Sequence, residues 1–204
     1  DLWKTGWSTF VQIPKDVQAN SVPELVVTGN VVPYGSDKCA PAFLQNVKLT
    51  GSMMDGHEVL VRAGPLDGAS PFAVSFDGGD FQPIDAARGF ESFSAPAFSL
   101  KGMISDDEPG VWGPDAKLNM KLGAVSVTVK QHTEGRLEDS QSMLDLSVDG
   151  LDGVDSVGGW LGVDGSLTAG EAPSECLEAA FIADGGAPTA HKQGSASFQS
   201  PRVK

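Results

Sequence analysis

Acidic side chains that recur at a regular spacing are the first candidates for chemistry in this sequence. Asp149, Asp152 and Asp155 stand three residues apart, with glycines between them. Carboxylate oxygens are preferred ligands of Ca²⁺, so the cluster suggests a calcium site, the one cofactor worth weighing. An EF-hand loop instead places acidic residues at every second position and ends on a glutamate at its twelfth, which this segment does not do. A solvated turn without any cofactor is therefore the competing interpretation.

Catalytic patterns are incomplete along the chain. His57-Glu58 begins like the zinc motif H-E-x-x-H, but Val61 stands where the second histidine is required. The sequence has no G-x-S-x-G nucleophile elbow and no glycine-rich phosphate loop. All three histidines, His57, His132 and His191, are expected at the surface. The sequence thus predicts a protein that is not an enzyme, with the paired carboxylates of a glycoside hydrolase as an alternative.

Large aromatic side chains are the candidates for binding a partner. Trp3, Trp7 and Phe10 follow one another at the spacing of one helix face, and Trp112 lies in an acidic, proline-rich loop. Tryptophan is enriched among the anchors of protein interfaces. We therefore expect these four residues to contact protein partners, unless the N-terminal segment folds back onto its own domain. Placement of Trp112 in a groove beside carboxylates would favour a carbohydrate ligand instead.

The overall charge narrows the classes of partner. The chain carries 27 acidic and 14 basic residues and has a net charge of −13. Such a chain repels the phosphates of nucleic acids and of anionic lipids, so nucleic acid is not an expected partner. The sequence also lacks an apolar run of the roughly 20 residues that a membrane-spanning helix needs, and we do not expect an integral membrane protein.

The cysteines bear on the cellular compartment. Cys39 and Cys176 are the two cysteines of a chain that also holds 25 glycines and 13 prolines. An even count in such a chain predicts a disulfide bond, with two separate buried thiols as the alternative. Disulfide bonds persist outside the cytosol, and the chain begins with Asp1 rather than methionine. We therefore expect a secreted or organelle-lumenal protein from which a targeting segment has been removed.

Strands must position these residues. From Leu118 to Val129 apolar residues alternate with polar ones, which predicts one long strand with a buried face. A polar turn over residues 131–135 and an answering strand over 143–148 would complete a hairpin. Shorter strands are predicted in the segments 24–32, 43–50, 57–62, 72–76 and 97–104.

The segment 118–165 resembles a known extracellular domain. After the two predicted strands the chain runs through Gly158-Gly159-Trp160-Leu161-Gly162 and then reaches Asp164-Gly165. This order of strand, turn, strand and glycine-rich bend is similar to the C-terminal part of von Willebrand factor D-type domains, without their dense cysteine pattern. The resemblance implies an extracellular β domain with a structural or adhesive role.

Together these patterns predict an all-β fold, an antiparallel β-sandwich or β-rich barrel with Greek-key or meander connections and at most one or two short helices. We expect an aromatic N-terminal arm over residues 1–22, a single β domain over 23–182 and an extended Gly/Ser/Pro-rich tail over 183–204. The predicted function is that of a non-catalytic structural or interaction subunit of a larger extracytoplasmic assembly. A carbohydrate- or ligand-binding β-sandwich module is the first alternative, and an acid-catalysed glycoside hydrolase is the second.

Overall fold

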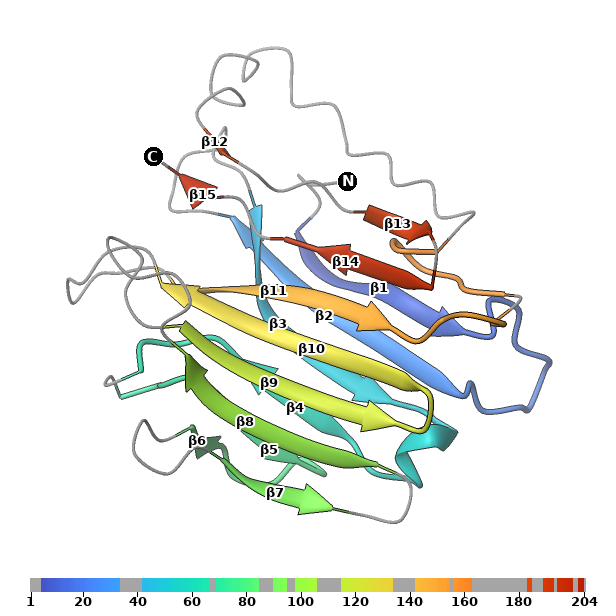
Figure 1. Cartoon of the computed structure of the whole chain (residues 1–204), viewed down its shortest axis with the longest axis horizontal. Helices are drawn as coiled ribbons and strands as arrows, with labels where there is room; N and C mark the ends of the chain where they lie inside the picture. The colour runs from blue at the N-terminus through green and yellow to red at the C-terminus, as the bar shows by residue number, and fades with distance from the viewer. Residues whose placement is uncertain are drawn as a thin grey trace.

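Antiparallel strands build the molecule, as the sequence predicts. In the computed structural model a curled sheet of thirteen strands forms a half-barrel (Figure 1). The residues that the structure describes are 5–33, 42–66, 69–84, 90–94, 98–105, 115–133, 142–154, 156–162, 183–184, 189–192, 194–199 and 202–203.

The first layer is a meander of six strands, in which each strand pairs with the next one along the sequence. Its strands are β1 (Gly6–Ile13), β2 (Leu25–Pro33), β3 (Ala42–Thr50), β4 (Val59–Arg62), β5 (Ala73–Phe76) and β6 (Gln82–Pro83). A short 3-10 helix, η1 (Ser52–Met54), lies between β3 and β4. The predicted hairpin around Asp55-Gly56 is confirmed, because β3 and β4 pair on either side of it.

The second layer is a meander from β7 to β11 that β14 and β13 extend, in the order β7–β8–β9–β10–β11–β14–β13. Its strands are β7 (Phe90–Ser94), β8 (Ser99–Ser105), β9 (Asp115–Leu122), β10 (Val125–Thr133), β11 (Ser142–Asp149), β13 (Thr189–Lys192) and β14 (Ser195–Phe198). Two further short strands, β12 (Ala183–Asp184) and β15 (Arg202–Val203), pair with each other in a separate sheet.

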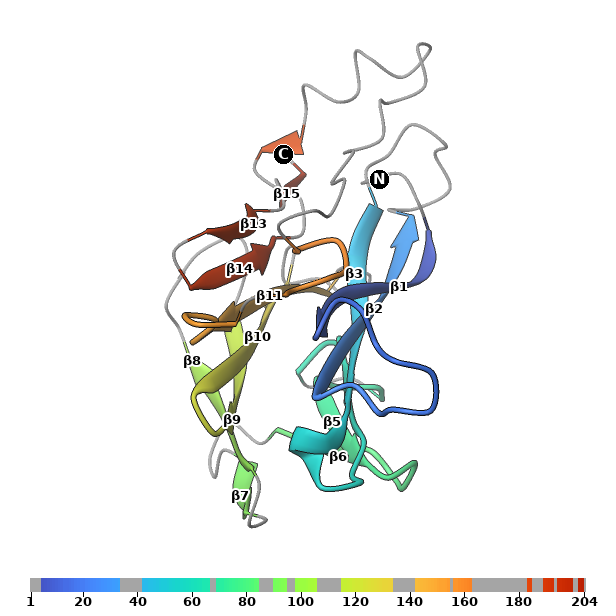
Figure 2. The same ribbon diagram turned by 90° about the vertical axis from the view of Figure 1, so that its right-hand side faces the viewer.

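A seam between β3 and β11 joins the two layers. Leu44 pairs with Leu144 at this seam. Farther along, β3 pairs with β4 on that edge, whereas β11 pairs with β14. The layers therefore diverge from the seam, as Figure 2 shows in a view along the strands' edges. Apolar side chains that point inward from both layers pack into one continuous core.

Period-two spacing of apolar residues explains why these segments are strands. On β10, Val125, Val127 and Val129 are all buried, while the residues between them are partly exposed. Branched side chains of this kind pack well on a pleated surface that is half buried. The alternation that predicted a two-faced sheet in this part of the chain is therefore confirmed.

The segment 118–129 nevertheless forms two strands rather than one. β9 ends at Leu122, which pairs with Val125 across the two-residue turn Gly123-Ala124. Gly123 has a φ of +62°, a conformation that glycine adopts without steric cost and that two-residue hairpin turns require. The residues Gln131–Thr133, predicted as a turn, belong to β10.

Both predicted end segments contribute strands to the large sheet. β1 comes from the predicted arm, residues 1–22, and pairs with β2 along its length. It is a strand, so the helical spacing of its aromatic residues does not correspond to a helix. β14 comes from the predicted tail, residues 183–204, and pairs with β11. The large sheet therefore includes strands from all three predicted segments, 1–22, 23–182 and 183–204.

A glycine-rich bend, residues 156–162, covers the free edge of β1. Gly158 exchanges two backbone hydrogen bonds with Gln12 of β1, at 3.0 and 2.8 Å. A Cβ at Gly159 would lie 2.7 Å from the backbone carbonyl of Phe10, and its φ is +87°. This position therefore requires glycine, in agreement with the predicted close approach of the backbone in the bend.

Candidate functional site

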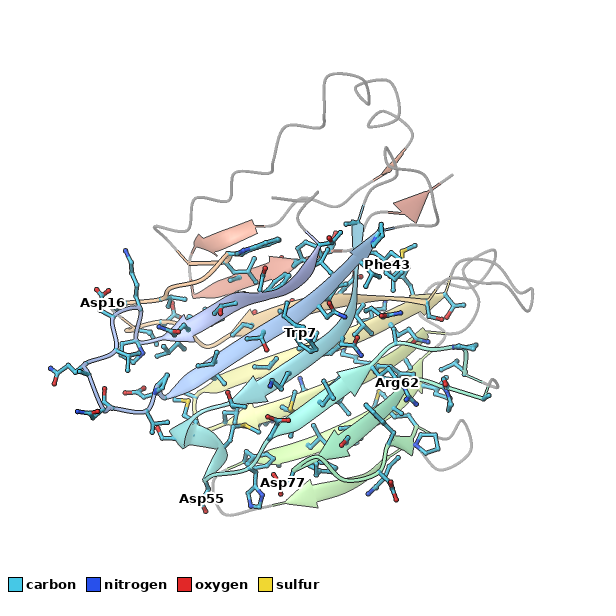
Figure 3. All side chains as sticks on the ribbon, turned by 180° about the vertical axis from the view of Figure 1, so that it is seen from behind. Trp7, Asp16, Phe43, Asp55, Arg62 and Asp77 are labelled. Carbon is cyan, nitrogen blue, oxygen red and sulfur yellow. The ribbon has the colours of Figure 1, made fainter. Side chains whose placement is uncertain are left out.

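Outward side chains of β1, β2 and β3 form a polar surface around one exposed tryptophan. Trp7 is 52% exposed, which is unusual for so large an apolar side chain. It projects from β1, the last strand of the first layer, onto the outer face of that layer (Figure 3). We call this surface the Trp7 face and define it by Trp7, Thr9, Thr28, Asn30, Asn46 and Lys48.

Strand register places these side chains in two neighbouring rows. In the first row Trp7 pairs with Asn30, which in turn pairs with Asn46. The second row runs from Thr9 through Thr28 to Lys48 in the same order of strands. Side chains directly opposite one another on adjacent strands lie about 5 Å apart, so each row forms a continuous strip.

The Trp7 face contains a shallow depression of about 370 Å³, which is lined by Trp7, Ser8, Thr9, Thr28 and Lys48. The Nζ atom of Lys48 lies 5.9 Å from the centroid of the indole ring, within the range of a cation–π contact. The same ammonium lies 3.5 Å from a carboxylate oxygen of Glu58. An aromatic ring beside an ammonium and two hydroxyls can bind a ligand that has one apolar side and several polar groups.

The two amides of the Trp7 face interact with each other. The Nδ2 atom of Asn30 donates a hydrogen bond of 3.3 Å to Oδ1 of Asn46. Asn46 pairs in turn with Arg62 of β4, whose guanidinium stacks 4.0 Å from the ring centroid of Phe81. The first row therefore continues across four strands as a strip of hydrogen-bonding groups that begins at an aromatic ring.

Phe10 does not belong to this surface. It is fully buried and packs against Trp160 and Phe198, with both ring centroids 5.1 Å away. The predicted partner contact of Phe10 has no exposed side chain to support it, because Phe10 lies three positions after Trp7 in a strand and period-two alternation puts it on the opposite, inner face. Trp3 and Trp112 lie outside the described residues.

The predicted calcium ligands are only partly described. Asp149 and Asp152 are exposed, and Asp155 lies outside the described residues. A Cβ on Gly194 would lie 2.4 Å from the carboxylate of Asp152, so the turn after β11 packs closely on the turn before β14. Among the described residues no three His, Cys, Asp or Glu side chains are placed to share a metal ion. The calcium site stays a prediction.

The histidines lie in different surroundings. His132 is completely buried, and its Nδ1 atom lies 3.5 Å from a carboxylate oxygen of Asp145. The prediction that His132 lies at the surface is therefore wrong, because β10 continues through the residues that were expected to form a turn. His57 is partly exposed, and its ring lies 5.9 Å from that of Phe98, which precedes β8 in the other layer. The side chain of His191 is not described.

His57 and Asp77 form a polar link between two turns. The Nδ1 atom of His57 lies 2.8 Å from Oδ2 of Asp77, and the amide of Glu58 donates a hydrogen bond of 2.7 Å to Oδ1. The backbone hydrogen bond from Glu58 is the main cause that lowers the pKa of Asp77, and the hydrogen bond from His57 lowers it further. This arrangement links the residues before β4 to the turn after β5, at the open end of the β4–β5 hairpin, and accounts for the lowered pKa of Asp77.

The polar members of the Trp7 face were missed by reasoning from motifs. Thr28 and Asn30 lie in one predicted strand, and Asn46 and Lys48 lie in another. Each pair has the spacing of two that puts both side chains on the outer face. That spacing was a usable signal, but only the structure shows that these strands are neighbours and that Trp7 lies beside them.

Comparisons with known proteins do not identify the chain: no family model, curated protein or solved structure matches it. The similarity to von Willebrand factor D-type domains therefore stays a prediction. Cys39 and Cys176 lie outside the described residues, and so does the predicted disulfide bond. In the part of the chain that the structure describes, no helix is both long and apolar enough to cross a bilayer.

Proposed function

We propose that the protein is a non-catalytic interaction subunit of a larger extracytoplasmic assembly and that it binds a protein partner through the Trp7 face. The observation that carries the proposal is the half-exposed indole of Trp7 on the outer face of the first layer, beside Thr9, Thr28 and Lys48. Apolar surface that a partner removes from water stabilises a complex by about 25 cal/mol per Å² before other costs. Tryptophans in such positions often contribute most of the affinity of an interface.

The surroundings of the indole suit an interface. Lys48, Thr9 and Thr28 surround the ring with groups that hydrogen-bond to a partner or to water. A central apolar anchor within a polar rim is the usual composition of a protein–protein interface. The extracytoplasmic location rests on the predicted Cys39–Cys176 disulfide bond and on the resemblance of residues 118–165 to extracellular domains.

The test begins with isolation of the native protein under mild conditions, to identify proteins that co-purify at fixed stoichiometry. The partner's affinity is then measured for the wild type and for Trp7→Ala. We expect the substitution to weaken binding at least tenfold, because truncating an anchor residue typically costs about 2 kcal/mol or more. Val22→Ala is the matched control, since Val22 is another exposed apolar residue and lies away from this face. Equal affinities of Trp7→Ala and the wild type would refute the proposal.

A neutral carbohydrate is the second candidate ligand for the same face. The row of Asn30 and Asn46 beside Trp7 favours it, because amides and a flat aromatic ring together match the hydroxyls and the apolar face of a sugar. Titration with neutral oligosaccharides, followed by tryptophan fluorescence, tests this candidate. The signal assigned to Trp7 is the difference between the wild type and Trp7→Phe. A fluorescence change that persists in Trp7→Phe would place the sugar elsewhere.

A further inference from the structure

We propose that the outer face of the second layer binds an acidic polysaccharide that carries sulfate or carboxylate groups. Four lysines project from three adjacent strands there: Lys101 of β8, Lys117 and Lys121 of β9, and Lys130 of β10. We call this surface the lysine face. Its strands lie towards the viewer in Figure 1, whereas the Trp7 face is seen from the opposite side in Figure 3.

Strand register fixes the spacing of the four lysines. Lys117 lies directly opposite Lys130, and Lys101 lies opposite Asn119, which is midway between Lys117 and Lys121. Strands about 4.8 Å apart, with a rise of about 3.4 Å per residue, place the four Cα atoms in a patch of roughly 10 by 14 Å. The lysines therefore form a compact group of positive charges on a rigid sheet.

This concentration of positive charge is not explained by composition or by stabilisation of the fold. Only 14 of the 204 residues are basic, and the net charge is −13, yet four lysines share one small patch. Like charges placed directly opposite on adjacent strands, as for Lys117 and Lys130, destabilise a sheet. Within the described part of the chain, Lys101, Lys117 and Lys121 form no ion pair. Lys130 has an interaction of its own and lies opposite Asp145, so an anionic ligand would compensate mainly the charges of Lys101, Lys117 and Lys121.

Among the described side chains, the acidic ones beside the lysine face are those of Asp145 and Asp149; Asp115 begins β9 two residues before Lys117, and its side chain is not described. Asp145 and Asp149 project from β11, where Asp145 lies opposite Lys130 and Asp149 lies opposite Ser126. Asp145 also lies near the buried His132. The three lysines of β8 and β9, Lys101, Lys117 and Lys121, are separated from the carboxylates of β11 by one or two intervening strands.

Groups between the lysines favour a polysaccharide over other anionic polymers. Asn119 donates hydrogen bonds to the hydroxyls of Thr128 and Ser126, at 2.9 and 3.2 Å, and these polar groups fill the space between the charges. The described side chains of this face include no aromatic ring. Single-stranded nucleic acids bind by stacking their bases on aromatic rings, and protein partners are commonly anchored by them, so both are less suited to this face. Lysine ammoniums act as point charges and do not demand bidentate geometry, so they suit anionic groups that are spread along a flat polymer.

The negative net charge of the molecule does not prevent such binding at physiological ionic strength. Charges in water are screened over a Debye length of about 8 Å, and packed sheets lie about 10 Å apart. Exposed carboxylates of the first layer, such as Asp55, Asp77 and Asp80, therefore contribute little at the lysine face. A bound polymer responds mainly to the charges beneath it.

The experiment measures binding of dextran sulfate to the full chain by calorimetry, with uncharged dextran and duplex DNA as comparison ligands, at 0.05 to 0.3 M NaCl. We expect dextran sulfate to bind with an affinity that falls as salt rises, and uncharged dextran not to bind. The double variant Lys117→Gln/Lys121→Gln should bind about tenfold more weakly. Lys15→Gln/Lys48→Gln changes the net charge equally, but Lys48 belongs to β3 and Lys15 follows β1, so both sites lie away from β8–β10 and this variant should bind like the wild type.

Several outcomes would overturn the proposal. Equal losses in the two double variants would show a nonspecific charge effect. Binding of uncharged dextran that persists in Trp7→Ala would show that charge is not what is recognised. Tighter binding of DNA than of dextran sulfate would assign the face to nucleic acid. Salt-sensitive self-association that the Lys117→Gln/Lys121→Gln variant abolishes, without dextran sulfate binding, would assign it to a second copy of the chain.

Two further measurements keep the result interpretable. Amide chemical shifts of the wild type that change over β8–β10 on adding dextran sulfate support the proposal without any substitution, and changes confined to β1–β4 contradict it. Trp7→Ala should bind dextran sulfate like the wild type. Loss of protein-partner binding and loss of dextran sulfate binding are therefore separable results.

Discussion

At the scale of single residues, Asp77 makes the stability of the fold depend on pH. Its carboxylate accepts a hydrogen bond from the Glu58 amide and lies 2.8 Å from His57, and both contacts lower its pKa. A carboxyl group whose pKa is lower in the folded protein than in the unfolded chain stabilises the fold above the unfolded pKa. That contribution is lost as pH falls through the folded pKa.

We therefore expect Asp77→Asn to be less stable than the wild type at neutral pH and nearly equal to it in strong acid. Asparagine keeps an oxygen that can accept the Glu58 amide, so the comparison isolates the negative charge. The difference should shrink as pH is lowered through and below the ordinary value of 3.8. Urea denaturation at several pH values between 7 and 2 measures it. A difference that does not vary with pH would contradict this assignment.

Single residues were also where the sequence was least informative about exposure. Trp7 and Phe10 lie three positions apart in β1, yet one is exposed and the other is fully buried. Residues three positions apart occupy opposite faces of a strand but one face of a helix, so the exposure of both depends on which of the two periods applies to this segment. The exposure of Trp7 was consistent with the prediction of a partner-binding residue, whereas the buried Phe10 and His132 were not foreseen.

At the scale of elements, the glycine-rich bend packs its backbone so closely on the backbone of β1 that no side chain fits at Gly159. Gly158 pairs with Gln12, and the amides of Trp160 and Leu161 donate to the carbonyls of Thr9 and Phe10. The bend therefore acts as an additional partner of β1, and it carries Trp160 onto Phe10.

Substitution of Gly159 should weaken this contact. Gly159→Ala places a Cβ 2.7 Å from the backbone of Phe10 and requires a positive φ, so we expect a loss of about 2–4 kcal/mol in unfolding free energy. Gly153→Ala is the matched control, because Gly153 also has a positive φ, +78°, but a Cβ added there would have no other atom within 4 Å. The control should lose only about 1–2 kcal/mol, the cost of the backbone conformation alone. Equal losses in urea denaturation would show that the bend does not pack as closely as described.

Most elements were predictable because alternation is a local signal, whereas one hairpin was missed. Buried residues occupy even positions up to Leu122 and odd positions from Val125 onwards. A continuous strand cannot change parity without a bulge, so the two intervening residues, Gly123-Ala124, had to form a turn. Gly123, which stands where the buried positions change from even to odd numbers, was the residue in the sequence that indicated this turn.

At the scale of the whole molecule, a strand from near the C-terminus completes the core. β14 pairs with the second half of β11, and its Phe198 lies edge-on against Phe10 of β1. Three segments that are far apart in the sequence, β1, the bend and β14, thus meet around a single aromatic side chain.

Removal of this strand should therefore destabilise distant parts of the fold. Deletion of residues 195–204 removes Phe198 and Ala196 from the core, and we expect a loss of at least about 3–5 kcal/mol. Amides of β11 that face β14 should exchange with deuterium faster, and the uncovered strand edge should promote aggregation. Deletion of residues 200–204 alone retains β14 and is the control. Equal melting temperatures of the two truncated chains would contradict a structural role for β14.

The global arrangement could be predicted only in part. Meander pairing of successive strands follows from short connections, and the all-β class follows from alternation and turn residues. The seam at Leu44 and Leu144 joins residues about a hundred positions apart, and no local pattern specifies that pairing. For the same reason the composition of residues 183–204 suggested an extended tail, although β13 and β14 of that segment extend the sheet beyond β11.

The divergence of the two layers from one seam has a consequence for how the protein could act in an assembly. The outer surfaces of the layers point away from each other, with the shared core between them. A molecule bound on one side leaves the other side free, so the two proposed ligands do not compete. Such an adaptor would cross-link a protein component to an acidic matrix, and each attachment would raise the effective concentration of the other.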